Sequence, residues 1–425
     1  MAAVVFIAFF GFNFVLPILP LYVRTLGSGD VGQAALVSGL MLAISPLLAA
    51  IFSPVWGLVA DRYGRKRMVQ RSLLVMVACT ILMGFVAHLW QLFLLRAAIG
   101  VFGGFTAMAM AYMVTVTPPE KATSALGLLQ ASQVGGVIVG PLCAGLVADH
   151  WGIRASFFGG AIVVFCGFLV LTLLTPDDRA AAASRVAGDG PTGATANDRE
   201  TVQAQPTSGP ARTEKSGNPL RGLATLGTAA RLPGFFAVMA VLFCAQVVDR
   251  SFGPVLPLYV AALGTPEERV ASFAGLVVSL GAIGTAISAT VTGRLGARLP
   301  LRWLLVVTLV AGVALCLPMA LAQTPLQLLV ERTLLGLFAG GTLTLGYSLA
   351  NSLVPPERKG AAFGVLSSVT LLGSALSPLT MGALSAIDLR AVFVVDSVLY
   401  AIALLLALRI KPTRQPAVVA AVAGA

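Results

Sequence analysis

Three acidic side chains fall inside long apolar stretches of this 425-residue chain, where an ionised carboxylate is costly. They are Asp249, Glu331 and Asp396. Such a group is suited to binding and releasing a proton, because burial favours the neutral carboxyl and a nearby arginine favours the carboxylate. Asp249 is the first candidate, since it lies near the middle of its stretch. For Glu331 the alternative is an ion pair with its arginine neighbour, and for Asp396 a position at the headgroups or a packing role.

Three arginines also lie inside apolar stretches, where a cation lines a cavity or finds a partner. Arg96 has two open interpretations. One is hydrogen bonds to loop carbonyls at the outer end of its helix. The other, a role in proton transfer, is what the resemblance of residues 95–104, L-R-x-x-x-G-x-x-G-G, to the helix 4 motif of the major facilitator superfamily implies. Arg250 follows Asp249 but projects about a third of a turn away from it on a helix, and Gln246 lies one turn before both. The ionisable residues with a candidate proton role are therefore Asp249, Glu331, Arg96, Arg250 and Arg332.

A charged turn separates two long apolar runs at residues 57–67, which read G-L-V-A-D-R-Y-G-R-K-R. One acid, Asp61, is followed by four bases, and neither the apolar run before the turn, 33–59, nor the one after it, 72–95, contains a charged residue. This pattern predicts a tight turn at a membrane surface. One interpretation of its bases is that they only anchor the topology. The residues with a candidate conformational role are Gly57, Asp61, Arg62, Gly64, Arg65 and Lys66.

The composition indicates a membrane protein that crosses the bilayer many times. Hydrophobic residues make up 57% of the chain and charged residues only 11%, against roughly 25% charged in soluble domains. The net charge of +11 does not indicate a nucleic-acid partner, because cytoplasmic loops of membrane proteins collect Lys and Arg. The five cysteines lie in apolar runs without a C-x-x-C pair, and the two histidines fall in short loops, so we expect no metal site.

Apolar runs of about 20 residues, long enough to cross a bilayer as helix, recur twelve times. We therefore predict an all-α membrane protein with two six-helix bundles, at 1–175 and 232–410. A polar segment, 176–231, would be a mostly disordered linker, with a possible interfacial helix at 220–231, and 411–425 a cytoplasmic tail. The expected spans are 2–23, 33–60, 68–87, 91–116, 122–148, 156–175, 235–262, 271–292, 301–322, 326–354, 361–385 and 391–408.

The distribution of positive charge predicts the orientation. With both termini in the cytoplasm, 21 of the 28 lysines and arginines fall on the inner side and four in outer loops. Cytoplasmic loops carry such an excess. The chain is therefore expected to be a multi-pass protein of the cell membrane with both termini inside.

The two halves repeat one plan at an offset of 236 or 237 residues. Residues 19–23, L-P-L-Y-V, recur at 256–260, and P-P-E-K at 118–121 recurs as P-P-E-R at 355–358. Arg96 and Gly100 recur as Arg332 and Gly336. Halves related in this way place a substrate cavity between them near the midplane. The counterpart of the charged turn, at 293–298, has lost the acid.

The turn G-x-x-x-D-R-x-G-R-K resembles a motif of the major facilitator superfamily. A second pattern resembles the motif of its drug:proton antiporter branch, apart from an alanine at Ala144, and consists of Gly127, Gly136, Gly140, Pro141 and Gly145. The resemblance implies the twelve-helix fold and proton-coupled export. It also implies that Asp61 acts as a conformational latch against the start of helix 361–385. Ordinary packing of small residues is the alternative for the second pattern.

The residues available to line a cavity are aromatic, Met and amide side chains with little charge, a mixture suited to amphipathic ligands of varied shape. They are Asn13, Phe14, Met108, Tyr112, Gln133, Gln246, Phe252, Tyr347 and Asn351. We expect a monomeric multidrug exporter in the lipid bilayer, with a small-molecule substrate, protons as the coupling ion and no other cofactor. The alternatives are an exporter of one metabolite, sugar or lipid, and a facilitator without proton coupling. Nothing in the sequence supports a membrane enzyme or receptor.

Overall fold

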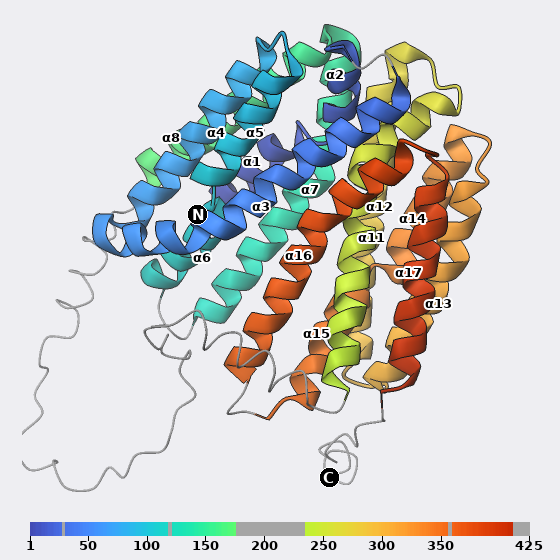
Figure 1. Cartoon of the computed structure of the whole chain (residues 1–425). Helices are drawn as coiled ribbons and strands as arrows, with labels where there is room; N and C mark the ends of the chain where they lie inside the picture. The colour runs from blue at the N-terminus through green and yellow to red at the C-terminus, as the bar shows by residue number, and fades with distance from the viewer. Residues whose placement is uncertain (28–29, 118–120, 176–233, 356–358, 411–425) are drawn as a thin grey trace, which may run out of the picture.

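The computed structural model describes residues 1–27, 30–117, 121–175, 234–355 and 359–410 (Figure 1). The expected linker, its interfacial helix and the expected tail lie outside these residues. The first half consists of α1 (Ala2–Asn13), α2 (Leu19–Thr25), α3 (Val31–Tyr63), α4 (Arg65–Gly84), α5 (Leu89–Phe102), α6 (Phe105–Val116), α7 (Ala122–Trp151) and α8 (Ile153–Leu174).

The second half repeats this order of helices. It consists of α11 (Phe235–Ala262), the 3₁₀ turn η2 (Glu267–Arg269), α12 (Val270–Leu295), α13 (Leu301–Ala320), α14 (Pro325–Ala339), α15 (Thr342–Leu353), α16 (Lys359–Ser385) and α17 (Ala391–Leu408). We call the end of the bundle where α8 stops and α11 begins the linker end, and the other the far end.

Ten stretches of the described residues form helix long and apolar enough to cross a membrane. The remaining two expected spans, 2–23 and 91–116, are each broken into two helices, so the prediction of continuous helices was wrong there. The first break precedes Leu19 and contains Pro17, which has no N–H to donate. The second falls at Gly103 and Gly104, and Gly104 adopts a left-handed φ of 82° that favours glycine. The tenth expected span breaks at the equivalent Gly340 and Gly341.

Matching tyrosines show that the sequence repeat is also a structural repeat. The Tyr22 hydroxyl donates to the carbonyls of Met83 and Val86, at 3.0 and 3.1 Å. In the second half the Tyr259 hydroxyl donates to Met319 and Ala322, at 3.0 and 3.4 Å. Each tyrosine therefore holds the start of its half against the end of the third span in the same way.

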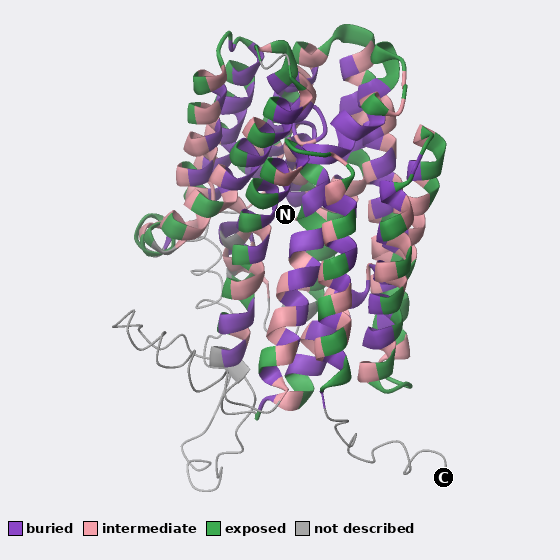
Figure 2. Cartoon of the chain, turned by 45° about the vertical axis from the view of Figure 1, so that its right-hand side comes forward, coloured by how far each residue is buried: buried purple, intermediate pink, exposed green. Residues whose placement is uncertain are grey.

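The two most extensive contacts between the halves are those of α7 with α12 and of α3 with α16, and α11 also packs on α2 and α3. Figure 1 shows α3 and α16 meeting near the far end, at the top of the view, and diverging towards the linker end. Large apolar side chains are exposed along the outside of the bundle, among them Leu58, Leu173 and Ile387 at 75, 75 and 85%. Figure 2 shows such exposed positions along the outer helices. This surface fits a lipid environment, because a soluble monomer rarely exposes so much apolar area.

Candidate functional site: a charged turn, a helix interface and a buried acid

The charged turn is a sharp reversal between α3 and α4. Gly64 lies between the two helices with φ 99°, a left-handed value that a residue with a Cβ adopts only with strain. Arg65 Nη1 donates to the Ala111 carbonyl of α6 at 2.9 Å, and Lys66 Nζ donates to the Thr175 carbonyl at the end of α8 at 2.7 Å. Lys66 thus lies at the end of α8, where carbonyl groups attract positive charge, whereas Arg65 contacts a carbonyl in the middle of α6.

The latch expected at Asp61 involves side chains outside those that the structure describes, both on Asp61 itself and on residues 359–361. Its role stays a prediction, as do those of Gly57 and Arg62. The position of Lys66 has a counterpart in the second half, where Arg302 Nη2 donates to the Leu408 carbonyl at 2.6 Å. In both halves, therefore, a basic side chain caps the carboxyl end of that half's last helix, α8 or α17.

Glycines along α7 permit two different close contacts. A Cβ at Gly136 would lie 2.7 Å from Phe10 N, and one at Gly140 2.8 Å from Phe10 O, so α1 packs directly on this face. A Cβ at Gly145 would collide with the Ala271 carbonyl of α12, in the other half. At Gly127, near the linker end, an added Cβ would meet no described atom within 4 Å.

Pro141 and α12 complete this contact, since a Cβ at Gly275 would collide with the Pro141 carbonyl. The motif therefore forms the far-end part of the interface between the halves, and the small-residue packing that was its alternative interpretation is present there too. Its role in antiport stays a prediction.

Helix α16 repeats the arrangement of α7 in the second half. Ser377 Oγ donates to the Val247 carbonyl of α11 at 2.5 Å, and a Cβ at Gly373 would lie 3.2 Å from Phe243 O. A Cβ at Gly382 would lie 2.9 Å from the Ala35 carbonyl of α3, across the interface. Like Gly127, Gly364 near the linker end faces no described atom within 4 Å.

Sequence reasoning missed a carboxylate that joins the halves. Asp149, near the end of α7, accepts hydrogen bonds from two backbone N–H groups in the first turn of α12: Ala271 N to Oδ1 at 3.2 Å and Ser272 N to Oδ2 at 2.7 Å. An acid in this position satisfies otherwise unpaired donors and the positive end of the helix dipole. The sequence signal was weak, because Asp149 stands at the end of an apolar run where a loop acid is ordinary.

Arg96 is 2% exposed, and its Nε donates to the Met41 carbonyl of α3 at 3.3 Å. Ser45, also on α3, donates to the Arg96 carbonyl at 2.7 Å. A Cβ at Gly100 would lie 2.6 Å from Ser45 O, so α5 and α3 pack closely around the arginine. The contact to a carbonyl matches the structural interpretation of Arg96, although the acceptor belongs to a helix and not to a loop. Its role in proton transfer stays a prediction.

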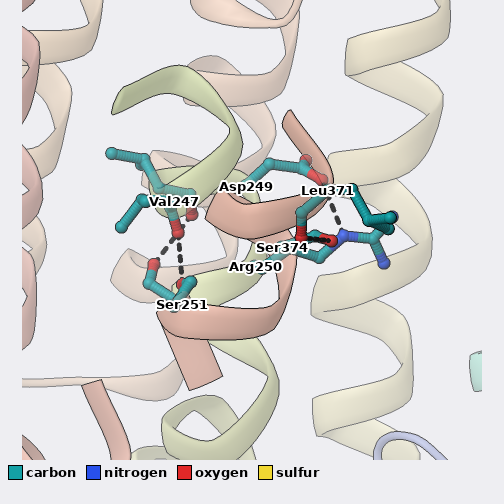
Figure 3. A network of polar contacts seen from close by, with 8 residues as sticks. Val247, Asp249, Arg250, Ser251, Leu371 and Ser374 are labelled. Atoms are coloured by element: carbon teal, nitrogen blue, oxygen red, sulfur yellow. Dashed lines mark hydrogen bonds and ion pairs between the residues drawn. The ribbon is translucent and has the colours of Figure 1, made fainter. Parts of the chain in front are cut away.

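Asp249 and Arg250 lie together on α11, beside Leu371 and Ser374 of α16 (Figure 3). Arg250 Nε is 3.5 Å from Asp249 Oδ2, and the two side chains are 53 and 40% exposed. The expected divergence of these neighbours therefore does not prevent an ion pair, because the long arginine side chain folds back. Asp249 lines a cavity of about 40 Å³. Its role as the proton carrier stays a prediction.

Glu331 accepts a hydrogen bond from Gln327 Nε2 at 3.0 Å, one turn before it on α14. Arg332 points elsewhere: its guanidinium carbon lies 4.3 Å from the centre of the Phe252 ring, a cation–π contact. Among the described residues, Glu331 and Arg332 form no ion pair, so the alternative proposed for them was wrong.

Asp396 is the buried acid of the second half, and the expectation that it faces the headgroups was wrong. It is 0% exposed, and Ser251 Oγ of α11 lies 2.6 Å from its Oδ2. Its Oδ1 has no hydrogen-bond partner in the described part of the chain. Helical phase decides this, since α17 turns Asp396 towards α11 and turns Val394 and Val398 outwards. The phase relative to neighbouring helices is not visible in an apolar run.

The candidate ligand residues do not gather in one place. Asn13, Phe14, Met108 and Tyr112 are buried within the first half, where they pack against its helices. Gln133 and Gln246 are half-buried, Asn351 is exposed, and Tyr347 has its hydroxyl 3.2 Å from Thr370 Oγ1. Only Phe252 belongs to the cavity beside Asp249. The residues that line this cavity include Asp249, Phe252, Thr285, Arg332 and Tyr400. The ligand-binding roles stay predictions.

Two pseudo-symmetric bundles of membrane-spanning helices, joined through α3–α16 and α7–α12, define a transporter. The family model of the Major Facilitator Superfamily matches residues 1–271 and 238–424, so the chain belongs to this superfamily and is a multi-pass membrane protein.

Curated relatives and solved structures agree with this assignment. The chain is 35% identical over 387 residues to Multidrug resistance protein MdtG of Klebsiella pneumoniae (strain 342), covering 91% of this chain and 86% of that one. It is 34% identical to the protein of that name from Salmonella heidelberg (strain SL476), covering 91% and 88%. A bacterial homologue of the human lysosomal transporter Spinster, inward-facing and occupied, has a TM-score of 0.72 at 15% identity, covering 98 and 97%. A mutant of the nucleoside transporter NupG has a TM-score of 0.70 at 15% identity, covering 96 and 98%.

Proposed function

We propose that this protein is a proton-coupled antiporter that exports small hydrophobic or cationic compounds by alternating access. The observation that carries the proposal is the similarity, along nearly the whole chain, to proteins named for multidrug resistance. The contacts of the α7 glycines across the halves support it, because this helix must slide on α12 without leaving a gap as the halves tilt.

The linker end is proposed to face the cytoplasm, because most of the lysines and arginines lie there. The halves touch at the far end through Gly145, Asp149 and Gly382, whereas Gly127 and Gly364 near the linker end face no described atom. The conformation is then one that is closed towards the outside and open towards the cytoplasm, ready to receive a compound from within the cell.

Closure of the outer side is assigned to Asp149. Two hydrogen bonds from the first turn of α12 hold this carboxylate of the first half, and both must break before the outer ends separate. Asp61, if it acts at the cytoplasmic end as its motif implies, would secure the opposite closure. The cycle makes and breaks no covalent bonds, so no catalytic residue is assigned. No nucleic-acid partner is assigned either. One chain contains both halves of the transporter, so we propose that it acts as a monomer.

Transport in proteoliposomes tests the proposal. With the purified protein and ethidium as an amphipathic cationic probe, an imposed pH gradient should drive dye movement that stops when an ionophore collapses the gradient. Dye movement that does not depend on the pH gradient would contradict antiport and support a facilitator without proton coupling. No movement of any of several hydrophobic and cationic dyes, with movement of one metabolite, sugar or lipid, would leave a dedicated exporter.

A further inference from the structure

The buried acid of α17 has a hydrogen-bond geometry that bears on its protonation. Ser251 Oγ lies 2.6 Å from Asp396 Oδ2 and 2.8 Å from the Val248 carbonyl. A serine hydroxyl carries one hydrogen, and it can donate to only one acceptor at a time. If Ser251 donates to the Val248 carbonyl, the hydrogen of the second contact belongs to the carboxyl group of Asp396, which then donates to Ser251 Oγ.

The surroundings of Asp396 fit a neutral group in this conformation. Arg332 of α14 lies close enough to interact with it electrostatically, yet no ion pair joins the two in the residues that the structure describes. The guanidinium instead stacks on Phe252, and Arg332 Nε has no hydrogen-bond partner there. An ionised carboxylate buried beside an unpaired guanidinium would draw it into contact, because a buried charge without its partner is strongly destabilising.

Each helix around Asp396 contributes its own group. Cys316 comes from α13, Arg332 from α14 and Tyr400 from α17 itself, and Asp249 of α11 is near enough to interact with Tyr400. The remaining neighbour, α16, has no ionisable residue between 362 and 385. Arg332 is thus the one cation of this group, and it has two alternative partners, the Phe252 ring and the Asp396 carboxylate.

A small cavity lies between Asp249 and Tyr400, close to the buried acid. The cavity of about 40 Å³ extends from Asp249, which is 40% exposed, to Arg332 and to Tyr400, one turn after Asp396. A site needs only about 10–15 Å³ to hold a water molecule. The cavity therefore has room for water between the exposed acid and the wall of the buried one.

The first half has no acid and serine at the positions equivalent to Asp396 and Ser251. The positions equivalent to Asp396 and Ser251, allowing for the repeat offset, are Gly160 and Phe14, and a Cβ at Gly160 would lie 3.0 Å from Phe14 Cβ. There the same contact between the first and last spans is apolar. A buried acid that packing does not need, and that costs free energy, indicates a function.

We infer that Asp396 is the residue that binds the coupling proton, with Ser251 as its hydrogen-bond partner and Arg332 as the partner that replaces the proton. The inference rests on the proposed antiport. In the cytoplasm-open state the carboxyl is protonated and Arg332 stays on Phe252. Release of the proton to water leaves a carboxylate, which draws Arg332 from the ring and moves α14 relative to α11 and α17.

Transport and infrared spectroscopy on the full-length protein test this inference. Asp396→Asn should lose ethidium movement driven by a pH gradient but keep counterflow, in which unlabelled ethidium on one side drives exchange with labelled ethidium and no net proton flux is needed. The wild-type protein without dye should show the carbonyl band of a buried protonated carboxyl, and this band should be missing in Asp396→Asn. Glu268→Gln, at an exposed turn, should match the wild type in both assays.

The outcomes separate the inference from the proposed function. Gradient-driven transport that survives in Asp396→Asn, or is lost in Asp249→Asn alone, would overturn the inference and leave antiport intact. A wild-type protein without gradient-driven transport would contradict antiport, while the infrared band still reports on Asp396. If Asp396→Asn does not fold, Ser251→Ala, which keeps the carboxyl, should displace the pH at which transport is half-maximal. An unchanged pH profile in that variant would refute the inference.

Discussion

Two carboxylates carry the roles proposed for this transporter, Asp149 at the interface between the halves and Asp396 inside the second half. The proposed role of each follows from its hydrogen-bond partners. Asp149 accepts from two backbone N–H groups across the interface, which tie its helix to the start of α12. Asp396 is enclosed by helices and contacts the hydroxyl of Ser251, which also lies within hydrogen-bond distance of the Val248 carbonyl. The two acids differ because one meets a helix N-terminus and the other a serine that bonds its own helix.

Asp149→Ala should weaken closure of the far end. An acid at a helix N-terminus contributes up to about 1 kcal/mol when exposed and up to about 2 kcal/mol when partly buried, so the ratio of far-end-open to far-end-closed molecules should rise by up to about fivefold in the first case and up to about thirtyfold in the second. Labelling rates of a single cysteine placed at Ala35, which is 0% exposed where α3 meets α16, measure the change. Asp388→Ala serves as the control, because Asp388 accepts from Arg390 N within its own half. Equal labelling in the two variants would refute the role of Asp149.

Helices α7 and α16 are the elements on which the halves meet, and each uses a different segment for each partner. Towards the linker end α7 faces open space at Gly127, in its middle it packs on α1, and near the far end it packs on α12. The same order holds for α16 with α11 and α3. Small residues permit these contacts because the backbones approach closely without side chains between them.

Gly145→Ala should destabilise this conformation, since its Cβ would collide with the Ala271 carbonyl, and overpacking a close contact costs about 1–3 kcal/mol. Thermal unfolding in detergent, followed by tryptophan fluorescence, should show a lower midpoint. Gly127→Ala is a matched control on the same helix and in the same motif, because its Cβ meets no described atom. A midpoint lowered equally by both substitutions would mean that helix propensity, and not the contact, sets the effect.

The molecule as a whole holds its halves together at one end. The contacts of Gly145, Asp149 and Gly382 all lie at the far end, and in this conformation they hold that end of the two six-helix bundles together. Internal bonds such as those of Tyr22 and Tyr259 keep each bundle rigid while it tilts. Alternating access then requires that one end opens as the other closes.

Distances between spin labels test this coupled motion. One pair, at the exposed Trp151 and Ile387, reports on the far end, and another, at the exposed Leu174 and Trp303, reports on the linker end. Lowering the proton concentration, or adding a transported dye, should lengthen the first distance and shorten the second in the same fraction of molecules. Two distances that change independently would contradict a tilt of rigid halves.

Composition, periodicity and repeats determined most of the architecture, because a helix in lipid must bond its own backbone and needs about 20 apolar residues to do so. Expected spans 235–262 and 391–408 match α11 and α17 to the residue. The repeat also predicted which residues are equivalent, such as Arg96 and Arg332. Breaks at Gly104 and before Leu19 were not predicted, since glycine and proline are tolerated inside many spans.

Only the tertiary structure decided which acid is buried. Asp249, Glu331 and Asp396 all stand in apolar runs, and sequence depth favoured Asp249, yet Asp396 is the one enclosed by helices. Rotation of a helix about its axis selects the side chains that face its neighbours, and a run apolar on all sides carries no periodic signal of that rotation. Asp149 was missed for a related reason, because its partners are backbone N–H groups, which every sequence supplies and none identifies.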